Sequence, residues 1–167
     1  TEADLLEPST GTRPHLGTGL TWARLCAAAV TVSDNTATQL LARRLGGPKA
    51  LQAFARRLGD EVTRFDRWEP DLNTNLPLDP RDTTTPEAMT RLLRAAFSTE
   101  VLDAGSQRQL FAWLKATTTG LARLRAAAPK EWEVGDKTGT SGNGAFNDVA
   151  VLRPPTGAPF YVSVFVN

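Results

Sequence analysis

Cysteine, histidine, methionine and tyrosine each occur only once in this chain of 167 residues. The one cysteine, Cys26, excludes an internal disulfide, so we expect either a small buried apolar side chain or a disulfide partner outside this sequence. The one histidine, His15, disfavours both a His-rich metal site and a Ser-His-Asp triad, and we expect it at the surface or at a helix cap. The sequence therefore predicts no metal and no cofactor.

A large net charge, a long apolar run and an N-terminal secretory leader are also missing. The net charge of +1 disfavours a nucleic-acid partner, and no apolar run reaches the length of a membrane span. Hydrophobic residues make up 41% and charged residues 22% of the chain, as in soluble globular proteins. We therefore expect neither nucleic acid nor a membrane as a partner.

Both ends of the chain are unusual for a natural domain. It begins with TEADLL, without methionine, and it stops at FYVSVFVN, inside a run that favours a β-strand. We therefore expect residues 1–167 to be one incomplete domain, cut from the interior of a longer protein.

Helical spacing of apolar residues dominates the first 130 residues or so, and strand-like runs dominate the rest. We expect helices over residues 21–32, 36–46, 47–59, 85–97 and 103–116, and strands over 131–140, 146–154 and 159–166. Residues 64–86 contain four prolines and keep neither period, which favours a functional loop. Consecutive strands with short turns form an antiparallel meander, so the region 131–167 is expected to add an antiparallel sheet to the helices, an α+β fold.

Three short stretches carry side chains suited to catalysis, although each has an ordinary structural explanation. Ser33-Asp34-Asn35 reads as a helix N-cap. Glu69 is explained as a solvated carboxylate in the proline-rich loop, and Lys137 as an exposed strand lysine beside Gly139. Together they offer a hydroxyl proton relay, an amide, a general base and a positive charge.

In order and spacing, these stretches resemble class A serine β-lactamases, a family with S-x-x-K, S-D-N and K-T-G motifs. Here S-D-N is residues 33–35, K-T-G is residues 137–139, and WEPDLN, residues 68–73, resembles the family's glutamate loop. The resemblance covers nearly the whole chain. It implies an incomplete α+β fold of the serine β-lactamase and penicillin-binding-protein type, with hydrolysis of the β-lactam amide of penicillins and cephalosporins and resistance to them.

The nucleophile motif of the family is missing. None of the six serines has lysine three positions later; they are Ser9, Ser33, Ser98, Ser106, Ser141 and Ser163. The resemblance places the nucleophile upstream of residue 1, so we expect the isolated chain to be inactive. We also expect the longer protein to be a periplasmic or secreted monomer.

The resemblance assigns catalytic roles to three residues. Glu69 is the base that activates the deacylating water, which Asn73 helps to hold. Ser33 passes a proton to the departing lactam nitrogen, and Lys137 orients Ser33 and attracts the carboxylate of the drug.

Further positions are implied to bind the substrate. Thr138 and Thr140, on either side of Gly139, contact the carboxylate, and the Thr140 N–H forms half of an oxyanion hole. Asn35 binds the amide side chain of the drug. Arg123 matches an arginine that supports the carboxylate in some members, and the alternative is an ordinary helix or turn arginine.

Two ion pairs are expected to stiffen the glutamate loop, residues 64–82. Arg67 with Asp82, and Arg64 with Asp66, resemble the pairs that close the loop in the family. The Glu69-Pro70 bond is often cis in the family. Two departures, Pro8 and Phe146, lie at positions that affect substrate choice, so the preferred drugs stay open.

Two other functions are compatible with these residues. One is a penicillin-binding peptidase of the same fold, and WEPDLN argues against it. The other is a catalytically inactive β-lactam-binding sensor, with which the missing nucleophile is compatible. The resemblance also makes residues 160–166 an interior strand of the complete fold, so we expect the isolated chain to expose that strand and aggregate.

Overall fold

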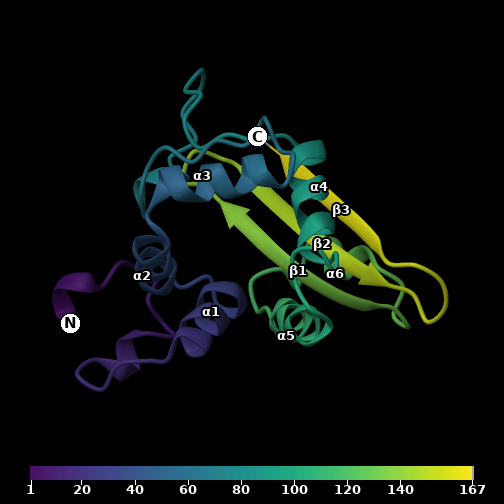
Figure 1. Ribbon diagram of the computed structural model, residues 1–167, viewed down its shortest axis with the longest axis horizontal. Helices are drawn as coiled ribbons and strands as arrows, with labels where there is room; N and C mark the ends of the chain where they lie inside the picture. The colour runs from purple at the N-terminus through teal and green to yellow at the C-terminus, as the bar shows by residue number, and fades with distance from the viewer. Residues whose placement is uncertain (167) are drawn as a thin grey trace.

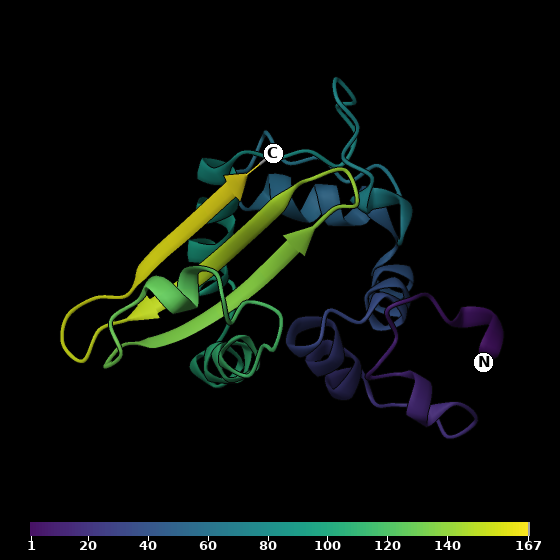
Figure 2. The same cartoon turned by 180° about the vertical axis from the view of Figure 1, so that it is seen from behind.

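The computed structural model describes residues 1–166 as two packed parts, shown in Figures 1 and 2. The N-terminal segment lies with the first helices on one side, and a three-stranded sheet with its covering helices lies on the other. The strand region expected from the sequence extends to residue 167, which lies outside the described residues.

The first part is helical. Its helices are α1 (Trp22–Thr31), α2 (Asn35–Leu45) and α3 (Pro48–Arg57). The Thr21 hydroxyl accepts a hydrogen bond from the Arg24 N–H, and the Asp34 carboxylate accepts one from the Ala37 N–H, so donors at two helix starts are satisfied. Apolar residues of α1 and α2 form the core of this part around Leu25, Ala28 and Ala37.

The second part is an antiparallel sheet in the order β1-β2-β3. Its strands are β1 (Glu133–Thr140), β2 (Phe146–Arg153) and β3 (Phe160–Val166). Lys137 on β1 is paired with Val149 on β2, and Asp136 with Ala150. Because neighbouring side chains of a strand point to opposite faces, Lys137 and Asp136 lie on different faces of the sheet.

Helices cover both faces. On the Lys137 face lie α4 (Pro86–Ala96) and α5 (Ala104–Lys115), which pack through a cluster centred on Phe111, Leu114 and Val151. On the Asp136 face lies the short α6 (Leu124–Ala127), over a cluster of Val134, Ala150 and Leu152. Figure 2 shows α6 in front of the sheet and α4 behind it.

The α+β class, the five longer helices and the antiparallel meander agree with the sequence predictions, with ends that differ by at most two residues. The sequence did not predict α6 or the short 3-10 helices Glu2–Asp4, Arg13–His15 and Asp71–Asn73. Residues 64–85 are otherwise irregular, and the Glu69-Pro70 bond is cis. Cys26 is half-buried rather than fully buried, and this burial raises the pKa of its thiol.

Candidate functional site

Ser33 lies in the tight connection between α1 and α2. Its φ of 55° is left-handed, a conformation that non-glycine residues rarely adopt. The next residue, Asp34, is fully buried and accepts hydrogen bonds from the backbone N–H groups of Gly11 and Thr12, each at 2.9 Å. These hydrogen bonds to Asp34 hold the connection between α1 and α2 in place, so Ser33 stays where the two parts of the molecule meet.

Lys137 reaches Ser33 from the sheet. Its Nζ donates to Ser33 Oγ at 2.9 Å and to the Thr138 carbonyl at 2.7 Å. Burial lowers the pKa of Lys137, and the nearby Glu69 carboxylate opposes this shift. The S-D-N and K-T-G stretches, far apart in the sequence, thus meet through a direct hydrogen bond.

Glu69 belongs to the glutamate loop and is half-buried. Its Oε2 accepts a hydrogen bond of 2.6 Å from Asn73 Nδ2. Burial raises the pKa of Glu69, while Asn73 and the positive charge of Lys137 act in the opposite direction. A carboxylate with a raised pKa is a better proton acceptor near neutral pH, as a general base requires.

Charged pairs hold the glutamate loop. Arg67 Nε donates to Asp82 Oδ2 at 2.6 Å, and both side chains are largely buried. Arg64 pairs with Asp66 at 2.9 Å, closer to solvent. The backbone N–H of Asp66 donates to Asp82 Oδ1 at 2.7 Å, and the Asp82 N–H donates to Asp66 Oδ2 at 2.9 Å. The two ends of the loop are therefore joined by reciprocal hydrogen bonds.

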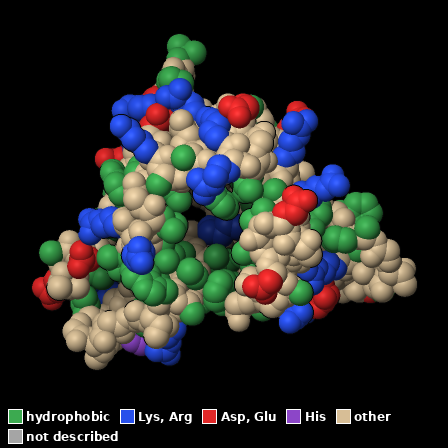
Figure 3. Space-filling model, viewed as in Figure 1, with side chains coloured by type: hydrophobic (Ala, Val, Ile, Leu, Met, Phe, Trp, Pro, Cys, Tyr) green, Lys and Arg blue, Asp and Glu red, His purple; other side chains and the backbone are tan. Residues whose placement is uncertain are grey.

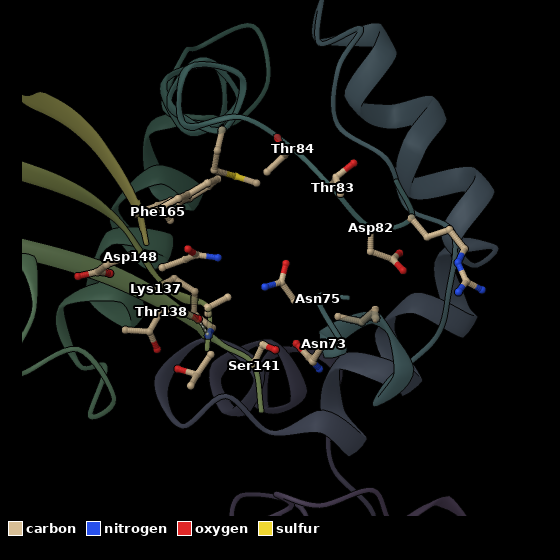
Figure 4. Close-up of a pocket in the computed structure, with 18 of the residues that line it drawn as sticks. Asn73, Asn75, Asp82, Thr83, Thr84, Lys137, Thr138, Ser141, Asp148 and Phe165 are labelled. Carbon is tan, nitrogen blue, oxygen red and sulfur yellow. Dashed lines mark hydrogen bonds between the residues drawn. The ribbon is translucent and has the colours of Figure 1, made fainter. Parts of the chain in front are cut away.

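A cavity of about 400 Å³ lies between the glutamate loop, α4 and the sheet. Figure 4 shows Asn73 and Asn75 of the loop across the cavity from Lys137 and Thr138 of β1. In Figure 3 the surface is hollowed between the two parts of the molecule, with basic side chains inside and at the rim. The cavity gives a small molecule access to the strand that carries Lys137.

Arg123 is hydrogen-bonded to the end of β1 that carries the K-T-G motif. Arg123 Nη1 donates to the Gly139 carbonyl at 3.0 Å and to the Asn147 carbonyl at 2.5 Å, and its Nη2 donates to Thr140 Oγ1 at 2.7 Å. The Thr138 hydroxyl lies 2.7 Å from the Thr119 hydroxyl. Arg123 therefore brings a positive charge beside Thr140, where an anion could bind.

Four of the predicted catalytic and substrate-binding residues do not line the 400 Å³ cavity: Ser33, Asn35, Glu69 and Arg123. Asn35 Nδ2 donates to the Glu7 carbonyl at 2.6 Å. The structure thus places Asn35 against the N-terminal segment, beside Ser33 in the chain but outside that cavity. Its contact with a substrate stays a prediction.

Sequence reasoning missed the threonines at 117–119 and the turn after β1. Thr117 Oγ1 donates to the Val30 carbonyl at 2.9 Å, so the run of threonines ties α1 to the sheet part. Ser141 Oγ donates to the Thr74 carbonyl at 3.2 Å, as does Asn143 Nδ2. The T-T-T run was the available signal for the first contact, and no local pattern marks the second.

Within residues 1–166, no group of three or more His, Cys, Asp or Glu side chains is placed where it could hold a metal ion.

Comparisons with known proteins match the chain along its length. A family model described as "Beta-lactamase enzyme family" matches residues 1–167. The β-lactamase AST-1 of Nocardia asteroides is 51% identical over 162 residues, which cover 97% of this chain and 52% of that protein. A β-lactamase of Amycolatopsis lactamdurans is 46% identical over 164 residues, 98% of this chain and 54% of that protein.

A solved structure gives the same picture. The class A β-lactamase described as the last common ancestor of Gram-negative bacteria superposes with a TM-score of 0.95 and 55% identity, covering 98% of this chain and 63% of that one. The chain spans about half the length of the curated relatives that it matches.

Proposed function

The chain belongs to the class A β-lactamase family, and on this basis we propose that the full-length protein carrying it hydrolyses β-lactam antibiotics through a serine acyl-enzyme. The observation that carries the proposal is the hydrogen bond of 2.9 Å from Lys137 Nζ to Ser33 Oγ. It joins two of the family's motifs in space, with Glu69 close enough to Lys137 to oppose the fall in its pKa.

Acylation needs a proton at the departing lactam nitrogen. Because Lys137 Nζ donates to Ser33 Oγ, the hydroxyl hydrogen of Ser33 is left to be donated elsewhere. We propose that Ser33 donates it to the lactam nitrogen, and that Lys137 keeps the hydroxyl oriented. The serine that attacks the lactam carbonyl is supplied by an S-x-x-K motif outside residues 1–167.

Deacylation needs a water molecule and a base. Oε2 of Glu69 accepts a hydrogen bond from Asn73, and within the described chain Oε1 accepts none. We propose that Oε1 takes a proton from a water molecule also held by Asn73, and that this water attacks the acyl ester. The raised pKa of Glu69 suits this step.

Substrate binding is proposed for the K-T-G strand and its neighbours. The carboxylate of the drug would meet the charges of Lys137 and Arg123 and the hydroxyl groups of Thr138 and Thr140. The Thr140 N–H would supply half of the oxyanion hole, and Asn35 would bind the amide side chain of the drug.

Replacement of Glu69 by glutamine in the full-length protein tests the proposal. The amide cannot take the proton from water, so deacylation should fall by at least about 10²-fold while acylation continues. Mass spectrometry after mixing with benzylpenicillin should show a stable covalent adduct. Glu131→Gln, an exposed position outside the site, is the matched control and should not accumulate the adduct. Turnover of Glu69→Gln at the rate of the unaltered protein would contradict the assignment.

Purified residues 1–167 alone should not hydrolyse a chromogenic cephalosporin, because none of their serines lies in an S-x-x-K motif. The measurement is the absorbance change against a buffer blank. Turnover above the blank that Ser33→Ala abolishes would show that the chain supplies its own nucleophile.

A penicillin-binding peptidase or an inactive β-lactam-binding sensor is the second candidate. The missing S-x-x-K motif is compatible with a sensor, whereas the pairing of Glu69 with Asn73 favours an enzyme that deacylates. Sequencing upstream of residue 1 distinguishes the enzyme from the sensor, because an S-x-x-K about sixty residues before Ser33 supports the enzyme and its absence supports the sensor.

We further propose that the full-length protein is a periplasmic or secreted monomer, as the family resemblance implies. Across residues 1–166, no helix is long and apolar enough to cross a membrane.

A further inference from the structure

Two buried aspartates have no part in the chemistry proposed above. Asp136 on β1 is fully buried and Asp148 on β2 is 3% exposed. Asp136 is paired with Ala150, and Asp148 with Thr138, so the aspartates are diagonal neighbours on the α6 face of the sheet. In Figure 4 the Asp148 side chain points away from Asn73 and Asn75.

Each aspartate has one satisfied and one unsatisfied oxygen. Asp136 Oδ1 accepts from Arg125 Nε at 2.9 Å and Nη2 at 2.5 Å, and Asp148 Oδ2 accepts from the Leu124 N–H at 3.0 Å. In the described part of the chain, Asp136 Oδ2 and Asp148 Oδ1 have no partner. A buried carboxylate oxygen without a donor is costly, so two of them on diagonally neighbouring residues imply a donor of some kind.

Gly120 leaves little room for a donor beside Asp136. A Cβ at this position would lie 1.6 Å from Asp136 Oδ2, so the backbone of Gly120 presses against the carboxylate. A proton carried by the neighbouring carboxyl needs no such room. One O–H···O bond between the two aspartates would satisfy both oxygens.

The surrounding charges favour one proton on the pair. Arg125 neutralises one aspartate through its bonds to Asp136. The other basic groups have partners of their own. Arg123 donates to backbone carbonyl groups where β1 ends and β2 begins, and Lys137 donates to Ser33 on the opposite face of the sheet. Lys115 of α5 pairs with Glu133 at 2.5 Å. The β3 residues on this face are apolar, Val162 and Val164 among them. Burial, with the charge of Asp136, raises the pKa of Asp148 to about 6, although the hydrogen bond from the Leu124 N–H and the charge of Arg123 act in the opposite direction.

The pair also holds the segment that carries Arg123. Asp148 binds the backbone of Leu124, and Asp136 binds the side chain of Arg125, which in turn donates to the carbonyls of Leu114 and Lys115 at 3.1 and 2.8 Å. The residue before Leu124 is Arg123, whose guanidinium reaches Thr140. Displacement of either aspartate would therefore move Arg123.

We propose that Asp148 takes up a proton from solvent on Oδ1 and donates it to Asp136 Oδ2, and that the resulting bond positions Arg123 for the carboxylate of the substrate. Loss of the proton leaves two like charges on diagonally neighbouring residues, which pushes the carboxylates apart and loosens the Arg123 segment. The positioning role rests on the function proposed above, whereas the shared proton does not.

Asp148→Asn in the full-length protein tests the shared proton. The asparagine copies the protonated acid at every pH, since its oxygen can accept from Leu124 and its amide can donate to Asp136. A carboxyl whose pKa is higher in the folded than in the unfolded protein contributes stability below pH 3.8, and this contribution is lost as the pH rises through about 6. Relative to the unaltered protein, the Tm of Asp148→Asn should therefore rise by roughly 5 °C from about pH 4.5 to about pH 8.

Two controls separate this effect from a change of net charge. Glu131→Gln removes one negative charge at an exposed position, and its Tm difference from the unaltered protein should stay constant with pH. Asp136→Asn removes the anion that Arg125 binds, so its Tm should fall at every pH. A measurement without any variant is the infrared difference spectrum of the unaltered protein, where the carbonyl stretch of a protonated carboxylic acid should disappear across this pH range.

Positioning of Arg123 is read from steady-state kinetics with a cephalosporin. At about pH 8 the KM of Asp148→Asn should be roughly threefold below that of the unaltered protein with kcat little changed, and the two KM values should converge near pH 5.

Equal pH profiles of Tm, together with no protonated-acid band, would overturn the shared proton. A shared proton with an unchanged KM ratio would overturn the positioning role. If the protein hydrolyses no β-lactam, only the proposed function fails, because the Tm and infrared results stand independently.

Discussion

The glutamate loop and the β-sheet hold their parts of the site by different means. In the sheet, Lys137 lies on a strand that is hydrogen-bonded along its length and packed on Phe111 and Leu114. In the loop, Glu69 lies on irregular backbone held by Arg67 and Asp82 at its ends and by Asn73 within. The position of the proposed base therefore depends on a few polar contacts, whereas many cooperative contacts hold the lysine.

Asp82→Ala should have the largest effect on this contrast. It leaves the largely buried Arg67 guanidinium without its main partner, and breaking a buried pair typically costs about 3–5 kcal/mol. Because the loop would lose its closure, deacylation by the full-length protein should fall by about 10²-fold. Rapid-quench kinetics and urea unfolding measure the two quantities.

The second ion pair of the loop provides the control. Arg64 and Asp66 are more exposed, with 43% and 25% of their side chains accessible, so Arg64→Ala should cost less than about 1 kcal/mol. Equal losses in both variants would mean that the loop does not depend on its buried pair.

The sequence predicted the local structure of these regions, but not the contacts between distant residues. The helices and strands of both parts followed from apolar spacing and, at the start of α2, from the cap residues around Asp34, which act locally. The meeting of Ser33 with Lys137 followed only from the family resemblance, because no local pattern reports a contact between distant residues. Residues 124–127 are too few to show a helical period, and nothing in the alternation of β1 marks Asp136 as buried.

The outer edge of β3 should have an intermediate effect. Within residues 1–166, β3 is paired only with β2, and Val164 and Val166 are 43% and 54% exposed. The chain exposes 9823 Å², compared with about 8,000 Å² for a compact protein of its mass of 18.0 kDa. Isolated residues 1–167 should therefore associate in sedimentation velocity, with weak near-ultraviolet circular dichroism from the tryptophans.

Val164→Lys should reduce this association, because a charge on the outer edge of β3 opposes pairing with another chain. Thr156→Lys adds the same charge in the exposed turn between β2 and β3 and should have little effect. A monodisperse monomer with a cooperative thermal transition, even without substitution, would show that the edge is harmless.

The smallest effect is expected at the tip of the glutamate loop. Leu78 is fully exposed and has a φ of 65°, which is unfavourable for a side chain with a Cβ. Leu78→Gly should raise the free energy of unfolding by about 0.5–1 kcal/mol, or the Tm of the full-length protein by roughly 1–3 °C. Leu76→Gly, where φ is not positive, should give no increase in Tm measured by calorimetry.

Because the backbone at Ser33 is left-handed, stability and turnover favour different residues at this position. Glycine would adopt a φ of 55° without strain, yet it would remove the hydroxyl that Lys137 contacts. A library selected for heat resistance alone would thus accumulate glycine at this position and lose turnover, so directed evolution of this chain needs drug selection alongside heating.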